Sequence, residues 1–117
     1  MKPIIISANA GDEITAGKFL MADGSGGVVE NDTAGKEIGV AESSANTTTR
    51  PTVGVIKQGL VKVPAVVGAY NFGDKLEVAS DGQSVTAYSS GVVVGTAAES
   101  KEVTTDDNLL LVYLNIA

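Results

Sequence analysis

The 117-residue chain contains no histidine and no cysteine. It therefore lacks the commonest general base, thiol nucleophiles and the usual ligands of zinc and iron–sulfur centres, and it forms no disulfide. Tryptophan is also absent, and phenylalanine and tyrosine number two and three. These absences disfavour most enzyme mechanisms, and we expect neither a cofactor nor a metal site.

Long apolar runs are absent as well. A membrane span needs roughly 20 apolar residues, and a secretion signal also needs a longer run than the three isoleucines near the N-terminus. Basic residues are few, because 8 Lys and Arg stand against 14 Asp and Glu, for a formal net charge of −6. An acidic chain binds a phosphate backbone poorly. We therefore expect neither a membrane nor a nucleic acid as a partner.

The abundant residues are those of strands and turns: 16 Val, 14 Gly and 10 Thr. Gly-Asp and Asp-Gly pairs divide the chain at short intervals, and no stretch of a dozen residues keeps a helical period. The runs that suit strands are residues 2–7, 18–22, 27–30, 38–42, 52–63, 75–79, 84–87, 92–97 and 108–116. The composition and this spacing predict an all-β domain, either a small barrel or a sandwich.

Two of these runs carry a readable burial pattern. Within residues 52–63, Val occupies alternate positions near each end, at 53 and 55 and at 61 and 63. Gly59 between them indicates a bulge or a tight hairpin. Residues 109–114 are apolar throughout, which predicts a strand buried on both faces. Residues 42–51 and 99–108 are polar and are expected to be mobile loops.

An internal repeat is visible. An Asp23-Gly24 turn precedes Ile38-Gly39-Val40-Ala41, and an Asp81-Gly82 turn precedes Val94-Gly95-Thr96-Ala97. Gly39 and Gly95 stand 56 positions apart, about half the chain. Two copies of one β-unit are therefore predicted to share a core. We expect one domain over residues 1–117, with an N-terminal strand or arm (1–10), a first β-unit (11–63) and a second β-unit (70–117).

Reactive motifs fit poorly. The segment from Gly11 to Lys18 resembles a phosphate loop but has five residues between its glycines, and Phe19 stands where the hydroxyl is needed. The carboxylate pair Asp106-Asp107 would point to opposite faces of a strand, so solvated turn residues are the favoured interpretation. An enzyme that uses only these two carboxylates is the least favoured hypothesis.

One feature favours an interaction role. The apolar segment Pro3, Ile4, Ile5 and Ile6 forms either the first strand of the domain's own core or an arm that reaches a neighbouring subunit or lattice. Tyr70 and Phe72 place two of the five aromatic residues close together. These six residues are the candidate contacts with other subunits.

The order of turns and small-residue segments resembles one known family. The segments are Gly11-Asp12, the turn from Asp23 to Val29, Ile38-Gly39-Val40-Ala41, Gly-Leu-Val-Lys-Val-Pro at 59–64, Phe-Gly-Asp-Lys-Leu at 72–76, an Asp-Gly turn, Val94-Gly95-Thr96-Ala97 and the strand at 110–114. Over roughly residues 11–115 the chain is similar to the small capsid decoration, or cement, proteins of tailed bacteriophages.

The resemblance implies a β-barrel or β-tulip body that binds the outside of an expanded capsid, often as a homotrimer, and stabilises it. It implies the major capsid protein lattice as partner, a place on the outer surface of the virion after synthesis in the host cytoplasm, and no catalytic residues. The N-terminal segment would contact the shell. The alternative hypothesis is a β-clip-like barrel that binds a sugar or a small anion through loops 42–51 and 99–108.

Overall fold

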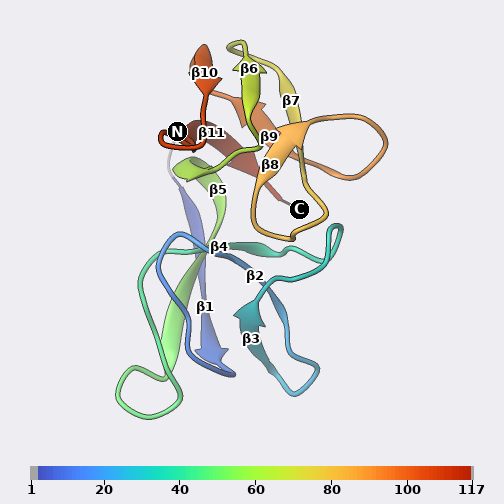
Figure 1. Ribbon diagram of the computed structural model, residues 1–117. Coiled ribbons are helices and arrows are strands. Elements are labelled where there is room, and N and C mark those ends of the chain that lie inside the picture. The colour runs from blue at the N-terminus through green and yellow to red at the C-terminus, as the bar shows by residue number, and fades with distance from the viewer. Residues whose placement is uncertain (1–2, 117) are drawn as a thin grey trace.

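The computed structural model describes residues 3–116, and within them the chain is all-β, as predicted. The strands form two lobes stacked along the 40 Å long axis of the molecule (Figure 1). Their bounds are β1 Ile4–Ala10, β2 Phe19–Ala22, β3 Gly27–Glu30, β4 Gly39–Ala41, β5 Thr52–Pro64, β6 Gly68–Tyr70, β7 Lys75–Val78, β8 Val85–Ala87, β9 Val93–Ala97, β10 Lys101–Val103 and β11 Leu109–Asn115.

One strand, β5, belongs to both lobes. Its N-terminal half pairs with β1 and β4, and these pairings close the order β1-β3-β2-β4-β5 into a ring. Its C-terminal half pairs with β11, from which the sheet continues through β9 and β7 to β8. Strands β6 and β10 form a separate two-stranded sheet. We call residues 4–58 the first unit and residues 59–116 the second unit.

The pairing registers of the two units correspond position by position. A pair in the first unit recurs in the second at an offset of 55 to 57 residues, with β1 of the first unit replaced by the C-terminal half of β5. Corresponding pairs include Leu20↔Gly39 with Leu76↔Gly95, Ala41↔Val55 with Ala97↔Val112, Ala8↔Val53 with Val63↔Leu110, and Ile14↔Ala45 with Tyr70↔Lys101. The chain therefore contains one β-unit twice.

Two apolar clusters fill the units. The cluster of the first unit is small and includes Ile14, Leu20 and Val55. Their counterparts Tyr70, Leu76 and Val112 lie in the larger cluster of the second unit. That cluster also takes in residues of the first unit, namely Phe19, Val40 and the half-buried Ile56. The apolar core is therefore continuous from the second unit onto the outer face of the first.

The turn between β7 and β8 fastens the units together. The Gln83 side chain accepts a hydrogen bond from Phe19 N–H at 2.9 Å and donates to the carbonyls of Phe19 (2.9 Å) and Asn31 (2.8 Å). Asn31 is buried, and its Nδ2 donates to the Gly82 carbonyl at 2.8 Å. Gly82 has φ of +78° and lies against the backbone of Asp32, so a side chain there would clash.

The alternation predicted for residues 52–63 is confirmed. Val53, Val55, Val61 and Val63 are buried, and Gly59 has φ of +139° where the strand bends between the units. The prediction for residues 109–114 is wrong. Leu110, Val112 and Leu114 are buried but Leu109 and Tyr113 are exposed, because the outer face of β11 has no covering layer.

Two strands were not predicted from the sequence. Strand β6 lies in the segment that joins the units, and β10 lies within residues 99–108, which were expected to be a mobile loop. Both strands have three residues and contain no run of β-branched or aromatic residues, so neither resembles a strand in the sequence. Their pairing with each other brings the two segments together.

Candidate interaction surface

The apolar N-terminal segment forms part of the chain's own sheet. The backbones of Ile4, Ile5 and Ile6 pair with β5, whereas their side chains are 40 to 47% exposed. Pro3 is exposed as well. This segment is therefore an integral strand that presents an apolar outer surface.

The two predicted aromatic contacts lie in different environments. Tyr70 is buried in the core of the second unit, and its hydroxyl donates to the Val66 carbonyl at 2.7 Å. Burial raises the pKa of Tyr70, while a hydrogen bond with Thr86 lowers it by less. Phe72 is 67% exposed. The pair therefore forms no joint surface patch, and only Phe72 faces a potential partner.

The exposed apolar side chains are concentrated in the second unit. Because the two units have the same fold, each exposed apolar residue of the second unit can be compared with the residue at the equivalent backbone position of the first unit. Val66 corresponds to Gly11, since the N–H of Val66 donates to the Val85 carbonyl and the N–H of Gly11 donates to the equivalent carbonyl, that of Val28. Phe72 likewise corresponds to Ala16, since each N–H donates to a serine hydroxyl, of Ser100 and Ser44 respectively.

Leu109 extends this comparison. It is 43% exposed, and it corresponds to Thr52 through their pairings with Pro64 and Asn9. Large apolar side chains thus stand on the surface of the second unit where the first unit carries glycine, alanine or threonine. Because the same fold tolerates small or polar residues at these positions, folding does not require the apolar ones. They mark a surface suited to contact.

The outer face of β9 and β11 is hollowed around Tyr113. A depression of about 570 Å³ is lined by Gln58, Val93, Gly95, Thr96, Tyr113, Leu114 and Asn115. A second depression, of about 280 Å³, also borders the Tyr113 side chain and is lined by Pro3, Gly59, Leu60 and Tyr113. None of these residues is charged. Tyr113 therefore borders two hollows that no charged side chain lines.

Sequence reasoning did not identify this face. Thr96 and Tyr113 lie on strands recognised in the sequence, but β11 was expected to be buried on both sides. Comparison of the two repeat units with their registers would have found it. Tyr113 corresponds to Ile56, and Thr96 corresponds to Val40, two residues in contact with the larger core.

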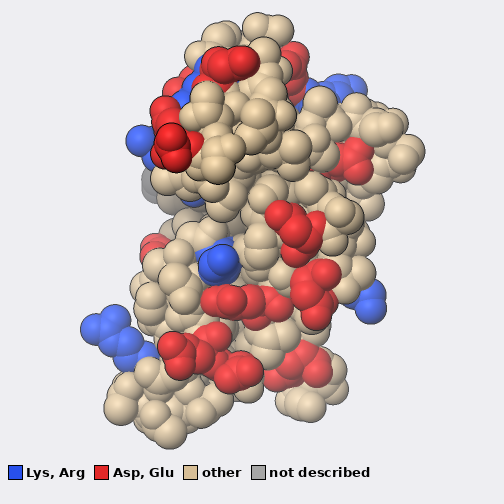
Figure 2. Space-filling view, in the orientation of Figure 1, with Lys and Arg blue, Asp and Glu red and all other residues tan. Residues whose placement is uncertain are grey.

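Acidic residues lie elsewhere on the surface. Figure 2 shows carboxylates on both lobes and across the middle of the viewed face, where they outnumber the basic residues. Backbone hydrogen bonds hold several carboxylates in the charged form. N–H groups of Ser25 and Gly27 lower the pKa of Asp23, and the N–H group of Ser89 lowers the pKa of Glu77. Burial raises the pKa of Asp81, but hydrogen bonds from Ser84 and Gln83 outweigh it, so the pKa is lowered.

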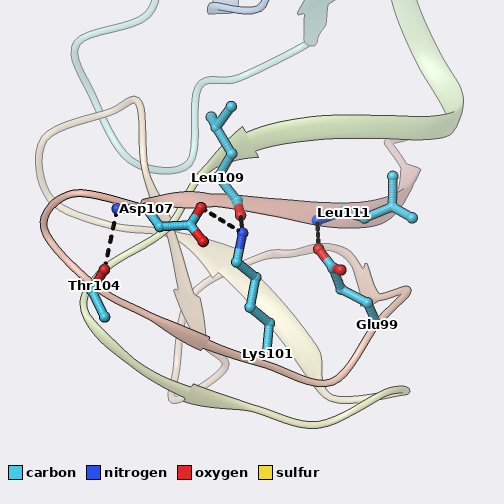
Figure 3. A network of polar contacts seen from close by, with 6 residues as sticks. All are labelled: Glu99, Lys101, Thr104, Asp107, Leu109 and Leu111. Carbon is cyan, nitrogen blue, oxygen red and sulfur yellow. Dashed lines mark hydrogen bonds and ion pairs between the residues drawn. The ribbon is translucent and has the colours of Figure 1, made fainter.

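The polar loop at residues 99–108 uses its own polar groups internally (Figure 3). Lys101 Nζ donates to Asp107 Oδ1 at 2.8 Å and to the Leu109 carbonyl at 2.6 Å. Glu99 Oε2 accepts from Leu111 N–H at 2.8 Å, so the carboxylate supports the edge of β11. In the equivalent loop at 42–51, Asn46 Oδ1 accepts from the N–H groups of Thr48 and Thr49.

At these two loops, we identify no cluster of polar side chains that point toward one another and could bind a ligand together. A shallow hollow of about 310 Å³ lies beside loop 42–51, next to Glu13 and Arg50. Asp106 and Asp107 are both exposed. Within residues 3–116, no three acidic side chains gather closely enough to hold a metal ion. No helix long and apolar enough to cross a membrane occurs among the same residues.

The fold and surface define an all-β protein of two repeated units, with exposed apolar side chains and a hollow without charged residues on the outer face of the second unit. No protein family model and no curated protein sequence matches the chain. Among solved structures, it is similar to the crystal structure of the N base of the head fiber gp8.5 of bacteriophage phi29, with a TM-score of 0.59 and 18% sequence identity. The match covers 97% of this chain and 95% of the other. It establishes a shared fold.

Proposed function

We propose that this chain is a non-enzymatic structural protein of a phage head, which binds the outer surface of the expanded capsid as a homotrimer and stabilises it. The carrying observation is the end-to-end match with a head fiber base, because nearly the whole of each chain takes part in one fold. The order of turns and small residues resembles capsid decoration proteins independently of that match.

The composition and the surface are consistent with this role. The chain has no histidine or cysteine and a net charge of −6. An acidic exterior keeps a crowded particle soluble. The exposed apolar side chains of the second unit, together with Ile4, Ile5 and Ile6, supply area for contact with a shell.

Stabilisation would follow from binding alone. A protein that binds only the expanded shell lowers the free energy of that state, by about 2.7 kcal/mol per site at a free concentration of 100 times Kd. Several linked contacts in one oligomer raise the effective concentration of each and strengthen the attachment. No change of conformation is required.

The test is co-sedimentation of the purified protein with expanded and with unexpanded shells of the phage that encodes it, assembled without it. We expect saturable binding to expanded shells only, with a copy number that is a multiple of three, and a higher shell melting temperature. A well-folded protein that sediments with neither form would contradict the proposal.

A further inference from the structure

The outer face of the first unit carries a row of three apolar residues that the second unit covers. Phe19, Val40 and Ile56 are neighbours across β2, β4 and β5. Phe19 and Val40 are 0% and 2% exposed, and all three belong to or pack against the core cluster of the second unit. The first unit therefore shows what occupies this face in this fold: another unit of the same kind.

The corresponding row of the second unit is uncovered. Lys75, Thr96 and Tyr113 make the same pairings across β7, β9 and β11. Tyr113 is 38% exposed, and the depression of about 570 Å³ lies over Thr96 and Tyr113. The place that a further unit would take is an open hollow.

Three buried valines of the second unit, which share a core cluster with the covered row, have more exposed counterparts in the first unit. Val61, Val78 and Val94 are at most 8% exposed and share a cluster with the covered row. Pairing register assigns them to Ile6, Ala22 and Ile38 of the first unit. Ile6 is 43% exposed, Ala22 is exposed and Ile38 is half-buried. The first unit thus covers the end of the second unit that carries these valines, whereas nothing within residues 3–116 covers the matching end of the first unit.

We propose that two copies of this chain associate head to tail, with the Lys75–Thr96–Tyr113 row of one copy against the Ile6–Ala22–Ile38 end of the next. The contact would repeat between molecules the packing that joins the units within one. Such a contact is heterologous, so it closes into a ring or extends, depending on the rotation between copies. It deepens the trimer part of the proposed function by naming the self-association surface.

Charge favours this pairing of surfaces. Copies with a net charge of −6 repel one another, so self-contact is least costly where neither side is acidic. The hollow beside Tyr113 is lined by uncharged residues, and Ile6, Ala22 and Ile38 are apolar. Lys75 is exposed at one end of the row, so its ammonium group can stay in water at the rim of the contact.

The intermolecular contact should be weaker than the internal one. Gln83, which fastens the units to each other, corresponds to Gly26 in the first unit, as judged from the pairing of Val28 and Val85. A neighbouring copy therefore brings no amide to the backbone of Lys75. The association is expected to be reversible and to depend on protein concentration.

Sedimentation velocity over a range of protein concentrations tests the proposal without any shell. Wild-type protein should associate reversibly. Tyr113→Glu and Ile6→Glu should each weaken the association constant by roughly tenfold or more, since each buries a charge in the contact. Val67→Glu, at a site 61% exposed and outside both surfaces, is the matched control and should associate as wild type. Melting curves check that each variant is folded.

A mixture of the two variants gives the sharpest outcome. Each retains the surface that the other has lost, so an equimolar mixture should form heterodimers that neither variant forms alone. A symmetric contact of Tyr113 with Tyr113 would instead leave Ile6→Glu unaffected and give no rescue on mixing. That result, or a wild-type protein that stays monomeric at every concentration, would overturn the inference.

Cross-linking provides an independent measurement because the chain has no cysteine. Ile6→Cys mixed with Thr96→Cys should form a mixed disulfide faster than either variant dimerises with itself. The same samples separate this inference from the proposed function. Shell binding by a protein that remains monomeric in all these assays would preserve the decoration role and exclude head-to-tail contact.

Discussion

The side-chain amide of Gln83 bonds to both backbone polar groups of Phe19, accepting from its N–H and donating to its carbonyl, each at 2.9 Å. Phe19 begins β2 of the first unit, and Gln83 lies between β7 and β8 of the second. A glutamine amide that bonds N–H and carbonyl together takes the place of a neighbouring strand. This contact adds hydrogen bonds between β2 and the turn after β7, two segments that do not pair as strands.

Gln83→Ala should therefore lower the free energy of unfolding by about 2 kcal/mol, because Phe19 N–H and the Asn31 carbonyl lose their partner, while the Phe19 carbonyl keeps the hydrogen bond from Asn31 N–H. Urea unfolding would measure the loss. Thr105→Ala, in an exposed loop, is the comparison and should change stability by less than about 0.5 kcal/mol. Equal stability of the two variants would mean that water replaces the amide without cost.

The equivalent glycines Gly39 and Gly95 should respond alike to substitution. A Cβ at Gly39 would meet the Val55 side chain and the Ile56 carbonyl, and one at Gly95 would meet the Val112 side chain and the Tyr113 carbonyl. Gly39→Ala and Gly95→Ala should each cost about 2 kcal/mol or more, because a backbone carbonyl must move. Thermal unfolding would show this as a large fall in Tm.

Gly91→Ala is the control for these two variants. A Cβ there would meet the Glu77 side chain and no backbone atom, and the backbone of Gly91 is free of positive φ. Only the Glu77 carboxylate, with its hydrogen bond from Ser89 N–H, would have to adjust, so the Tm should fall less than for the other two variants. A mild effect at Gly39 with a severe effect at Gly95 would show that the two units are unequal in packing despite their matching registers.

Stability should fall with acidity because of Asp23, Glu77 and Asp81. Folding lowers the pKa of each carboxyl, so each contributes stability that is fully present above its unfolded pKa, which is 3.8 for Asp and 4.5 for Glu. That contribution is lost as the pH falls through the folded pKa. The free energy of unfolding should stay level above about pH 5.5 and decline below about pH 4.5.

Glu77→Gln isolates one of these contributions. The variant should be less stable than wild type at pH 7, because the charged carboxylate accepts from Ser89 N–H more strongly than an amide does. The difference should shrink as the pH is lowered through the range in which Glu77 titrates. Denaturant unfolding at several pH values measures it, and parallel pH profiles would contradict the assignment.

Tyr70 and Phe72 should separate stability from binding. Tyr70→Phe removes the hydroxyl that donates to the Val66 carbonyl and should cost about 1 kcal/mol of stability with no change in shell binding. Phe72→Ser alters a side chain that is 67% exposed and should leave Tm almost unchanged. If Phe72 contacts the capsid, its substitution should weaken co-sedimentation with expanded shells. Weakened binding for Tyr70→Phe alone would reverse these roles.

Local patterns were enough to predict the all-β class and most strands. The Val positions of β5 alternate because one side of the strand faces the core, and the glycines at 39 and 95 repeat because each faces a neighbouring carbonyl. Strands β6 and β10 gave no such signal, since neither contains a run of β-branched or aromatic residues and each depends on pairing with the other.

The candidate surface was less accessible to sequence reasoning. Leu109 and Leu111 look like core residues, yet whether they are covered depends on which layer the chain places over β11. Tyr70 looked like a contact residue, but its position corresponds to Ile14, a core position of the first unit. Composition shows which side chains prefer burial, while only the tertiary arrangement shows which of them remain in water.

The sharing of β5 between units makes the molecule mechanically indivisible. Thirteen residues run from one lobe into the other, and the removal of either lobe would leave half of this strand without its neighbours. The lobes should therefore melt in one transition, and the amide protons near Gly59 should exchange only when the entire molecule opens. A force that pulls one lobe away from the other would act along the length of β5. The hydrogen bonds between β5 and its neighbouring strands would then resist the force in shear.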